Sequence, residues 1–282
     1  MPFDLRAMTR RANPGMRRKA IVLRDIKPPA TIATNLYRAC YKPVIDGWTA
    51  ALPRIEAEYA RTLSEITTDS PADAQAEIES ATDSINRLLL ILTPQVRDWA
   101  IRTEQWFRGQ WRGAVLSATG VDLETLIGAG DMRAPLETHI QWNTSLIKDV
   151  SDQARQRIGN AVFDGLRNRT PAREVAKTIR EAVGMGRDRS LRIAADQSNK
   201  LTSALADERR REAGITAWEW VWSRKLHGRE VHIARDGNYY SDDPADVGYE
   251  LNGKNLLAPP EDRPGQLPYC GCRSRSVIDL SD

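Results

Sequence analysis

Apolar residues recur at every third or fourth position along most of the chain before residue 214. One series of this kind is Val44, Trp48, Leu52, Ile55 and Tyr59. Because an α-helix turns once in about 3.6 residues, this spacing gathers the side chains on one face, where they can pack against another helix. Further series of the same period lie within residues 78–92, 96–110, 147–166 and 191–205. The pattern predicts long helices joined by short turns, as in antiparallel helical hairpins.

Proline and glycine residues indicate where these helices end. Thr93 and Pro94 separate two apolar series, and proline cannot donate the backbone hydrogen bond that continues a helix. Gly184 and Gly186 follow another series, and glycine is the usual residue just beyond a helix C-terminus. We therefore expect helix ends at both places, and a further end at Gly214.

The period of the pattern changes after residue 214. Trp218, Trp220 and Trp222 alternate with other residues, and a two-residue period is that of a β-strand. The remainder is rich in turn-forming residues, and residues 273–280 could supply a closing strand. We expect the tryptophans to form a core, although such rings can also stack on nucleic-acid bases. The predicted fold class is mainly α, with helical hairpins and a helical core, and with a small C-terminal cap that is β-rich and loop-rich.

These patterns divide the chain into four segments: a basic N-terminal arm (1–27), an N-terminal helical region (28–135), a helical core (136–214) and the C-terminal β-rich cap (215–282). The arm holds eight Lys and Arg residues against Asp4 and Asp25, although the whole chain has a net charge of only +3. Its scattered apolar residues offer little buried surface to offset the entropy lost on folding. We expect the arm to become ordered on an acidic partner and to contribute little to folding of the body.

Candidate contacts with DNA or another acidic partner lie at two places. One is the arm, and the other is the end of the last predicted helix, where cations favour the negative end of the helix dipole. The candidates are Arg6, Arg10, Arg11, Arg17, Arg18, Lys19, Arg209, Arg210 and Arg211. No apolar run approaches the roughly 18 residues that span a bilayer, so we expect no membrane partner.

The residues best suited to chemistry are two histidines and two cysteines of the cap: His227, His232, Cys270 and Cys272. Two imidazoles and two thiolates would satisfy a tetrahedral zinc ion, and a small turn-rich unit is the kind that a metal stabilises. Two other interpretations stay open. The thiols could pack beside a histidine without a metal, or they could form a reversible disulfide, strained across one intervening residue.

A cysteine and a histidine can also generate a nucleophilic thiolate, with Asp236 as the acidic member of such a set. The sequence offers no glycine loop that would bind an oxyanion and no phosphate-binding loop. We therefore predict no catalytic residues and a protein that is not an enzyme.

Five short motifs follow one another through the second half of the chain. They are residues 143–147 (Asn-Thr-Ser-Leu-Ile), 170–176 (Thr-Pro-Ala-Arg-Glu-Val-Ala), 193–201 (Ile-Ala-Ala-Asp-Gln-Ser-Asn-Lys-Leu), 229–237 (with Arg-Glu-Val-His and Asp-Gly) and 264–273 (with Pro-Gly and Cys-Gly-Cys-Arg). In this order and spacing the motifs resemble those of the Mu F-like family of minor head morphogenesis proteins from tailed phages. The chain departs from the family pattern at Gly271 and Ala195, where the family often has arginine.

The resemblance implies a structural virion protein, present in few copies at or near the portal vertex, that acts in head morphogenesis or genome delivery. The implied partners are the portal protein, the major capsid or scaffolding protein and packaged DNA. The implied location is the phage head, after assembly in the host cytoplasm. Two rival functions follow from the residues alone: a DNA-binding accessory virion protein that uses the basic arm, and a zinc-dependent hydrolase.

Overall fold

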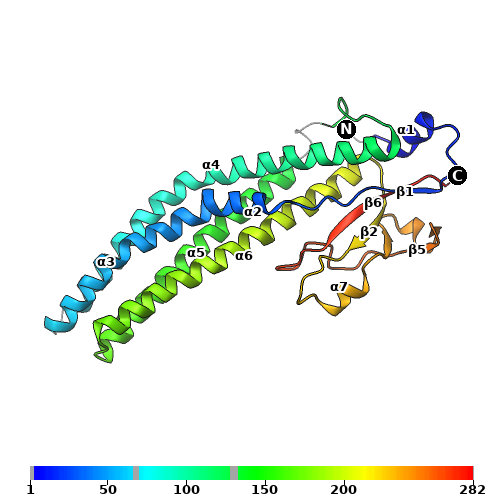
Figure 1. Cartoon of the computed structure of the whole chain (residues 1–282). Helices are drawn as coiled ribbons and strands as arrows, with labels where there is room; N and C mark the ends of the chain where they lie inside the picture. Colours follow the sequence, from blue (N-terminus) through cyan, green and yellow to red (C-terminus); the bar gives the residue numbers. More distant parts are fainter. Residues whose placement is uncertain (1–2, 66–69, 128–132, 282) are drawn as a thin grey trace. The chain divides into compact units, whose positions relative to one another are not determined.

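The computed structural model describes residues 3–65, 70–127 and 133–281 and shows a mainly α-helical chain with one small β-sheet (Figure 1). The helical elements are α1 (Leu5–Ala12), α2 (Ala30–Leu36), the π-helical turn η1 (Tyr37–Tyr41), α3 (Lys42–Glu65), α4 (Ser70–Thr119), α5 (Arg133–Arg167), α6 (Ala172–Glu212), α7 (Glu230–Ala234) and the 3-10 turn η3 (Pro244–Asp246). The strands are β1 (Ala20–Val22), β2 (Ala217–Val221), β3 (Tyr239–Ser241), β4 (Glu250–Leu251), β5 (Lys254–Leu257) and β6 (Arg273–Asp279). The predicted fold class is confirmed. None of the helices in the described part of the chain combines the length and apolar character that crossing a bilayer requires.

The chain forms two compact units. Unit 1 comprises Met1–Ile32, Ala100–His139 and Ala195–Asp282, and unit 2 comprises Ala33–Trp99 and Ile140–Ala194. This division differs from the successive segments expected from the sequence, because α4, α5 and α6 each give one part of their length to each unit.

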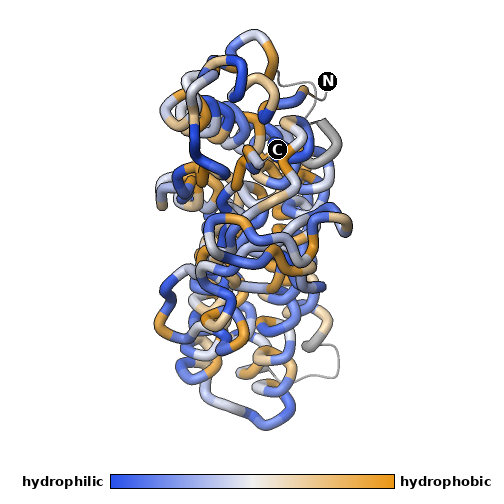
Figure 2. The backbone as a smooth tube through the Cα atoms, turned by 90° about the vertical axis from the view of Figure 1, so that its right-hand side faces the viewer, coloured by the Kyte–Doolittle hydropathy of each residue, from blue (hydrophilic) through white to orange (hydrophobic). Residues whose placement is uncertain are grey.

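Unit 2 is helical and buries the apolar stripe that the sequence predicts. All five residues of the series from Val44 to Tyr59 are buried. The indole Nε1 of Trp48 donates a hydrogen bond to Ser151 Oγ at 3.2 Å, and the Tyr59 hydroxyl donates to the carbonyl of Thr170 at 2.6 Å. Figure 2 shows short hydrophobic and hydrophilic stretches alternating along the backbone. The stripe therefore joins α3 to α5 and to the turn before α6.

Two of the predicted helix ends are wrong, because α4 continues through Pro94 and α6 continues through Gly184 and Gly186. Pro94 leaves the carbonyl of Leu90 without its helical donor, but Leu90 is 78% exposed, so water can hydrate that carbonyl. A glycine costs a helix only about 1 kcal/mol relative to alanine. Gly186 also permits close packing, since a Cβ atom there would lie 3.3 Å from Cδ1 of Ile45.

The sheet belongs to unit 1 and has the strand order β1-β6-β2-β3-β5-β4. Neighbouring strands are antiparallel except for the parallel pair β3 and β5. Gly214 follows α6 with a φ of +64°, and the chain then enters β2, as predicted. Trp218 and Trp220 of β2 are fully buried, and Trp218 stacks on Tyr240 with ring centroids 4.7 Å apart. These two tryptophans therefore form a core and do not offer a surface for stacking bases.

The N-terminal segment is part of unit 1, so the prediction that residues 1–27 contribute little to folding of the body is wrong. β1 pairs with β6 from Ala20 opposite Asp279 to Val22 opposite Val277. Leu5 and Leu23 are buried on either side of this strand. The prediction rested on the charge of the segment and gave these few apolar residues too little weight. The strand that pairs with β1 lies near the other end of the sequence.

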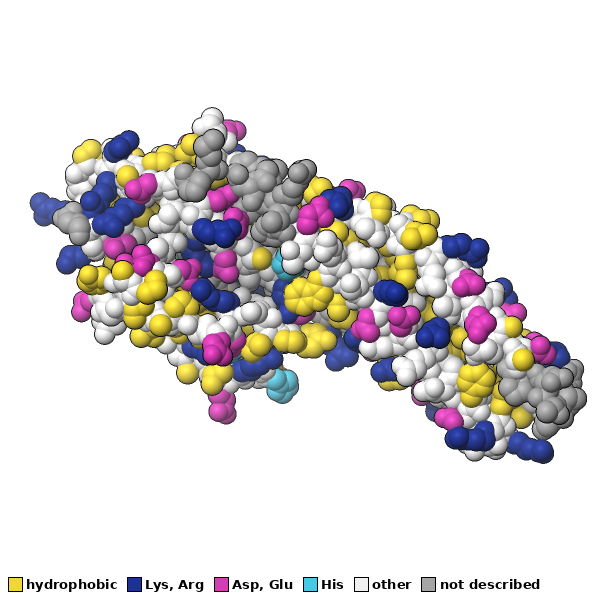
Figure 3. Space-filling model, turned by 180° about the vertical axis from the view of Figure 1, so that it is seen from behind, with side chains coloured by type: hydrophobic (Ala, Val, Ile, Leu, Met, Phe, Trp, Pro, Cys, Tyr) yellow, Lys and Arg dark blue, Asp and Glu magenta, His cyan; other side chains and the backbone are white. Residues whose placement is uncertain are grey.

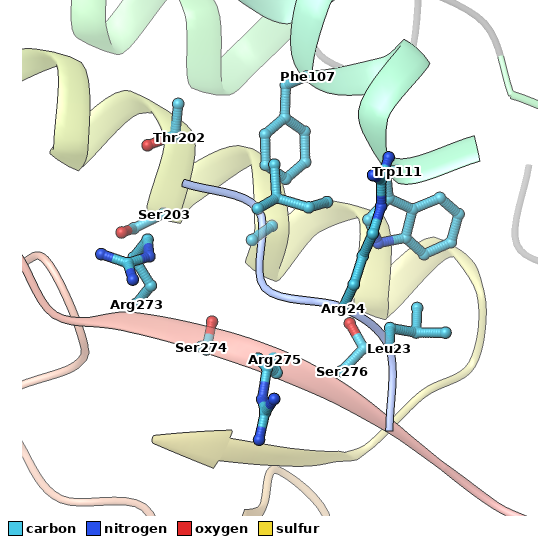
Figure 4. Close-up of a pocket in the computed structure, with 12 residues that line it drawn as sticks. Leu23, Arg24, Phe107, Trp111, Thr202, Ser203, Arg273, Ser274, Arg275 and Ser276 are labelled. Carbon is cyan, nitrogen blue, oxygen red and sulfur yellow. The ribbon is translucent and has the colours of Figure 1, made fainter. Parts of the chain in front are cut away.

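Polar contacts hold the same N-terminal segment. The backbone N–H of Phe3 donates to the carbonyl of Glu212 at 2.7 Å, and Arg273 pairs with Asp25 at 2.5 Å. Figure 4 shows Leu23 and Arg24 on the segment that follows β1, beside Trp111 of α4 and the side chains of β6, around a small pocket. The segment thus fills space between α4 and the sheet within unit 1.

Candidate functional site

Three of the four predicted zinc-ligand residues meet in the cap. His232 lies in α7, and Cys270 and Cys272 lie in the loop that leads into β6. The His232 Nδ1 atom is 3.5 Å from Cys270 Sγ and 3.7 Å from Cys272 Sγ, and the three side chains are 2%, 3% and 2% exposed. His227 lies in an exposed turn and is not a member of this group. The structure therefore reduces the predicted set of four residues to a His-Cys-Cys cluster.

A carboxylate and an indole ring fix the orientation of His232. Asp262 Oδ2 lies 2.7 Å from His232 Nε2, and Arg235 Nη1 donates to the other oxygen of Asp262 at 2.7 Å. The ring of Trp220 contacts the imidazole edge-on, with centroids 5.1 Å apart. Because Nε2 faces the carboxylate, Nδ1 is the nitrogen that faces the two sulfur atoms.

The two thiols influence each other's protonation. A hydrogen bond from Cys272 lowers the pKa of Cys270 to about 5, against the opposing effect of burial. The same hydrogen bond, together with burial, raises the pKa of Cys272 well above its ordinary value. Burial would raise the pKa of Asp262, but hydrogen bonds from Arg235 and His232 hold it below its ordinary value. Without a metal, the cluster therefore favours one thiolate, one thiol and an ionised Asp262.

Two residues of α6 hold the cysteine-bearing loop in place. The backbone N–H of Tyr269 donates to Asp196 Oδ1 at 2.6 Å, and Lys200 Nζ donates to the carbonyl of Gln266 at 2.7 Å. Asp196 and Lys200 are buried and lie 3.7 Å apart. Burial raises the pKa of Asp196 above its ordinary value, although the Lys200 ammonium acts in the opposite direction. The motif at 193–201 therefore has a physical role, because it fastens the loop to the helix.

Glycines allow the loop to approach its surroundings closely. Gly265 has a φ of +79°, and a Cβ atom there would lie 3.0 Å from Ser203 Cβ on α6. At Gly271 a Cβ atom would lie 3.0 Å from Ser223 Cβ and 2.9 Å from Lys225 Cε. The departure from the family pattern at Gly271 thus fits a crowded position in this chain.

The cysteine, His232 and Asp236 that could have formed a nucleophilic set do not come together. The Asp236 carboxylate accepts a hydrogen bond from the backbone N–H of Trp222 at 2.9 Å, and it is Asp262 that contacts His232. Cys270, His232 and Asp262 therefore form a continuous series of contacts. However, both sulfur atoms are buried, so a substrate has no approach to a thiolate in this arrangement.

The predicted contact residues at the end of α6 are mostly internal. Arg209 and Arg210 are each 1% exposed, which makes the prediction that they touch DNA or an acidic partner wrong. Arg209 donates to Glu104 at 2.8 Å and to Glu212 at 2.7 Å. Arg210 lies over the Trp218 ring and contacts Asp207 and Ser274. Of these three arginines only Arg211 is exposed, and its side chain pairs with Glu208 on the same helix.

Most basic residues of the N-terminal segment lie at the surface. Arg6 is half-buried, and Arg10, Arg11, Arg17, Arg18 and Lys19 are exposed. Arg6 and Arg10 donate to carbonyl groups at Leu280 and Ser281. Arg10, Arg17, Arg18 and Lys19 line one hollow beside Leu280 and Ser281. The face seen in Figure 3 shows basic and acidic side chains interspersed, in keeping with the small net charge.

Sequence reasoning missed Asp262, Asp196 and Lys200 as parts of the site. Asp262 stands 30 residues after His232 in a proline-rich stretch, where no spacing rule indicates a pair. Asp196 and Lys200 were identified as members of a motif, and an i, i+4 pair of opposite charge on a helix is ordinarily a surface feature. Their burial was the missing information.

Part of the chain is similar to a phage protein family. Residues 156–275 match the family model described as Phage Mu protein F like protein. This segment includes the His-Cys-Cys cluster, Asp262 and the two residues of α6 that hold the loop. An uncharacterised protein of Haemophilus influenzae is 28% identical over 167 residues, which cover 58% of this chain and 34% of that protein. The chain therefore spans about a third of the length of this relative. No solved structure matches the chain.

Proposed function

Because residues 156–275 match the family model of the phage Mu protein F like proteins, we propose that this chain is a minor head protein of a tailed phage. We further propose that it acts as a structural component at the portal vertex, in head assembly or in genome delivery, and that it is not an enzyme. The family match is the observation that carries the proposal. We expect the protein to assemble in the host cytoplasm and to remain in the phage head.

The geometry of the cap supports a structural role. The motif residues of α6 are used to hold the cysteine loop, and the His-Cys-Cys cluster lies beneath the surface. A zinc-dependent hydrolase needs a metal position that its substrate can reach. Contacts between proteins need no such opening. We therefore propose the portal protein as the principal partner, with the major capsid or scaffolding protein as further partners.

Co-expression with the portal protein of the same phage tests this proposal. We expect the chain to copurify with a tagged portal protein from a nuclease-treated lysate, and the complex to survive washing at high salt. A variant that carries Arg17→Gln, Arg18→Gln and Lys19→Gln should bind the portal equally well. If the two proteins are folded and soluble but do not associate, the proposed role at the portal is wrong.

The exposed cations Arg10, Arg17, Arg18 and Lys19 line one hollow. They favour a second candidate function, that of a DNA-binding accessory virion protein. Because DNA binding releases counterions, the affinity falls steeply as salt is added. The logarithm of the binding constant decreases with the logarithm of the salt concentration, with a slope of roughly 0.9 for each phosphate contact. In the same experiment without nuclease, this function would appear as DNA retained by the chain and lost in the triple variant. Retention of DNA without the portal would favour this second candidate.

A further inference from the structure

We propose that His232, Cys270 and Cys272 bind one zinc ion, which fastens α7 to the start of β6. The inference rests on the cap alone and is independent of the proposed function.

The three ligand atoms have the separations that a tetrahedral zinc ion requires. Zinc lies about 2.3 Å from thiolate sulfur and about 2.0 Å from imidazole nitrogen, so tetrahedral angles place the nitrogen about 3.6 Å from each sulfur. The observed distances from His232 Nδ1 are 3.5 Å to Cys270 Sγ and 3.7 Å to Cys272 Sγ. All three ligand atoms lie within 4.8 Å of one another. A zinc ion can therefore enter with small adjustments of these side chains.

The surrounding groups match those that support metal ligands. A ligating histidine commonly donates its second ring N–H to a carboxylate, which fixes the ring and makes it a better ligand. Asp262 is that carboxylate, and Arg235 holds it from the other side. Two thiolates would balance the charge of Zn²⁺, which removes the cost of burying the ion.

Trp220 gives an independent observation. Its indole Nε1 is buried and has no hydrogen-bond acceptor among the described residues. Trp220 packs with both cysteines. A buried N–H without an acceptor is costly, and a metal-bound thiolate beside it would supply a negatively charged acceptor.

The burial of the ligands indicates a metal that stabilises the fold, because the three side chains are only 2–3% exposed. Among the described residues the group has three members, so a water molecule would complete the tetrahedron. Catalytic zinc sites share this ligand count, but their metal is open to a substrate. The two thiols are free in this structure, and a disulfide across one residue would be strained. Zinc accounts for all of these features together.

The position of the ligands explains what the ion would stabilise. His232 lies between β2 and β3, and Cys272 immediately precedes β6, the strand that pairs with both β1 and β2. The strands β3, β4 and β5 have only three, two and four residues. Strands this short need support from elsewhere. A metal that joins α7 to the start of β6 would give this support.

Metal analysis of the full chain tests the inference. The protein is produced in medium containing zinc and purified under reducing conditions, with no chelator and no histidine tag. We expect elemental mass spectrometry to find about one zinc ion per chain. An organomercurial reagent that titrates the thiols of the wild-type protein should release this zinc, and cobalt substitution should give sulfur-to-metal charge-transfer absorption.

Three variants separate the site from adventitious binding. Cys270→Ser with Cys272→Ser should abolish zinc binding, while His227→Ala, at the exposed histidine outside the cluster, should retain one zinc per chain. Asp262→Asn should bind zinc about 10–100-fold more weakly. Circular dichroism checks that the helical content of each variant is unchanged, and the mercurial titration decides the matter if the cysteine variant fails to fold. Reduced wild-type protein without zinc, zinc that the mercurial does not release, or a Cys270–Cys272 disulfide in the freshly purified protein would each overturn the inference.

Discussion

Deletion of residues 1–27 lowers the melting temperature of the protein by about 10 °C or more. The deletion removes β1 from the edge of the sheet and exposes the surface that Leu5, Ile21 and Leu23 cover. Burial of each such side chain contributes about 1.5–3 kcal/mol, and each kcal/mol changes the melting temperature of a protein of this size by about 2–4 °C. Thermal unfolding followed by circular dichroism measures the effect.

A matched control separates this loss of packing from the loss of positive charge. Arg17→Gln with Arg18→Gln removes two exposed cations of the same segment and leaves β1 in place. This variant should melt within about 2 °C of the wild type, since exposed substitutions change stability by only about 0.5 kcal/mol. If the deletion also leaves the melting temperature unchanged, the pairing of β1 with β6 contributes nothing to stability and this account of the N-terminal segment is wrong.

Arg209→Met destabilises unit 1 by about 3–5 kcal/mol, the loss expected when a buried ion pair loses one partner. Arg209 pairs with both Glu104 and Glu212, at 2.8 Å and 2.7 Å, and all three side chains are buried. Methionine keeps most of the volume and the helix propensity, so the change isolates the charge. Denaturant unfolding monitored by tryptophan fluorescence measures the difference in the free energy of unfolding.

Arg211 provides the comparison on the same helix turn. Its side chain is 75% exposed and pairs with Glu208, so Arg211→Met should change the free energy of unfolding by at most about 0.5 kcal/mol. Adding Glu104→Gln to Arg209→Met should recover part of the loss, because it removes one of the two buried carboxylates that Arg209 neutralises. Equal effects of the two single methionine variants would contradict the burial of Arg209.

Local patterns in the sequence were sufficient for the elements whose structure depends on local periodicity. The stripe from Val44 to Tyr59 is buried because residues at this spacing share one helix face. Trp218 and Trp220 lie in a strand because alternation is a strand pattern. In both cases the information lies within about 15 consecutive residues.

Features that depend on distant partners could not be predicted. Arg209 and Arg210 look like a solvated helix end until Glu104 and Ser274 are placed beside them. β1 reads as part of a basic arm because its partner, β6, is more than 250 residues away. Pro94 interrupts the pattern of α4, but a long helix with exposed surface at this point tolerates it. Long-range packing decided each of these cases.

The His-Cys-Cys cluster illustrates both sides of this limit. Residue type alone selected His232, Cys270 and Cys272, since few side chains other than these bind zinc. Residue type could not exclude His227, which lies five positions before His232 but in an exposed turn. It also could not find Asp262, whose role depends on the folding of a loop back onto α7.

The central claim, that this chain is a minor head protein, is tested most directly by counting its copies in mature particles. DNA-filled heads of the phage that encodes the chain are purified on a density gradient and treated with nuclease and protease. Quantitative mass spectrometry then compares the chain with the portal protein. The account predicts the chain in every preparation, at a low and constant ratio to the portal protein and protected inside or tightly bound to the head. Heads that contain portal protein but lack the chain, both when mature and before DNA packaging, would contradict it.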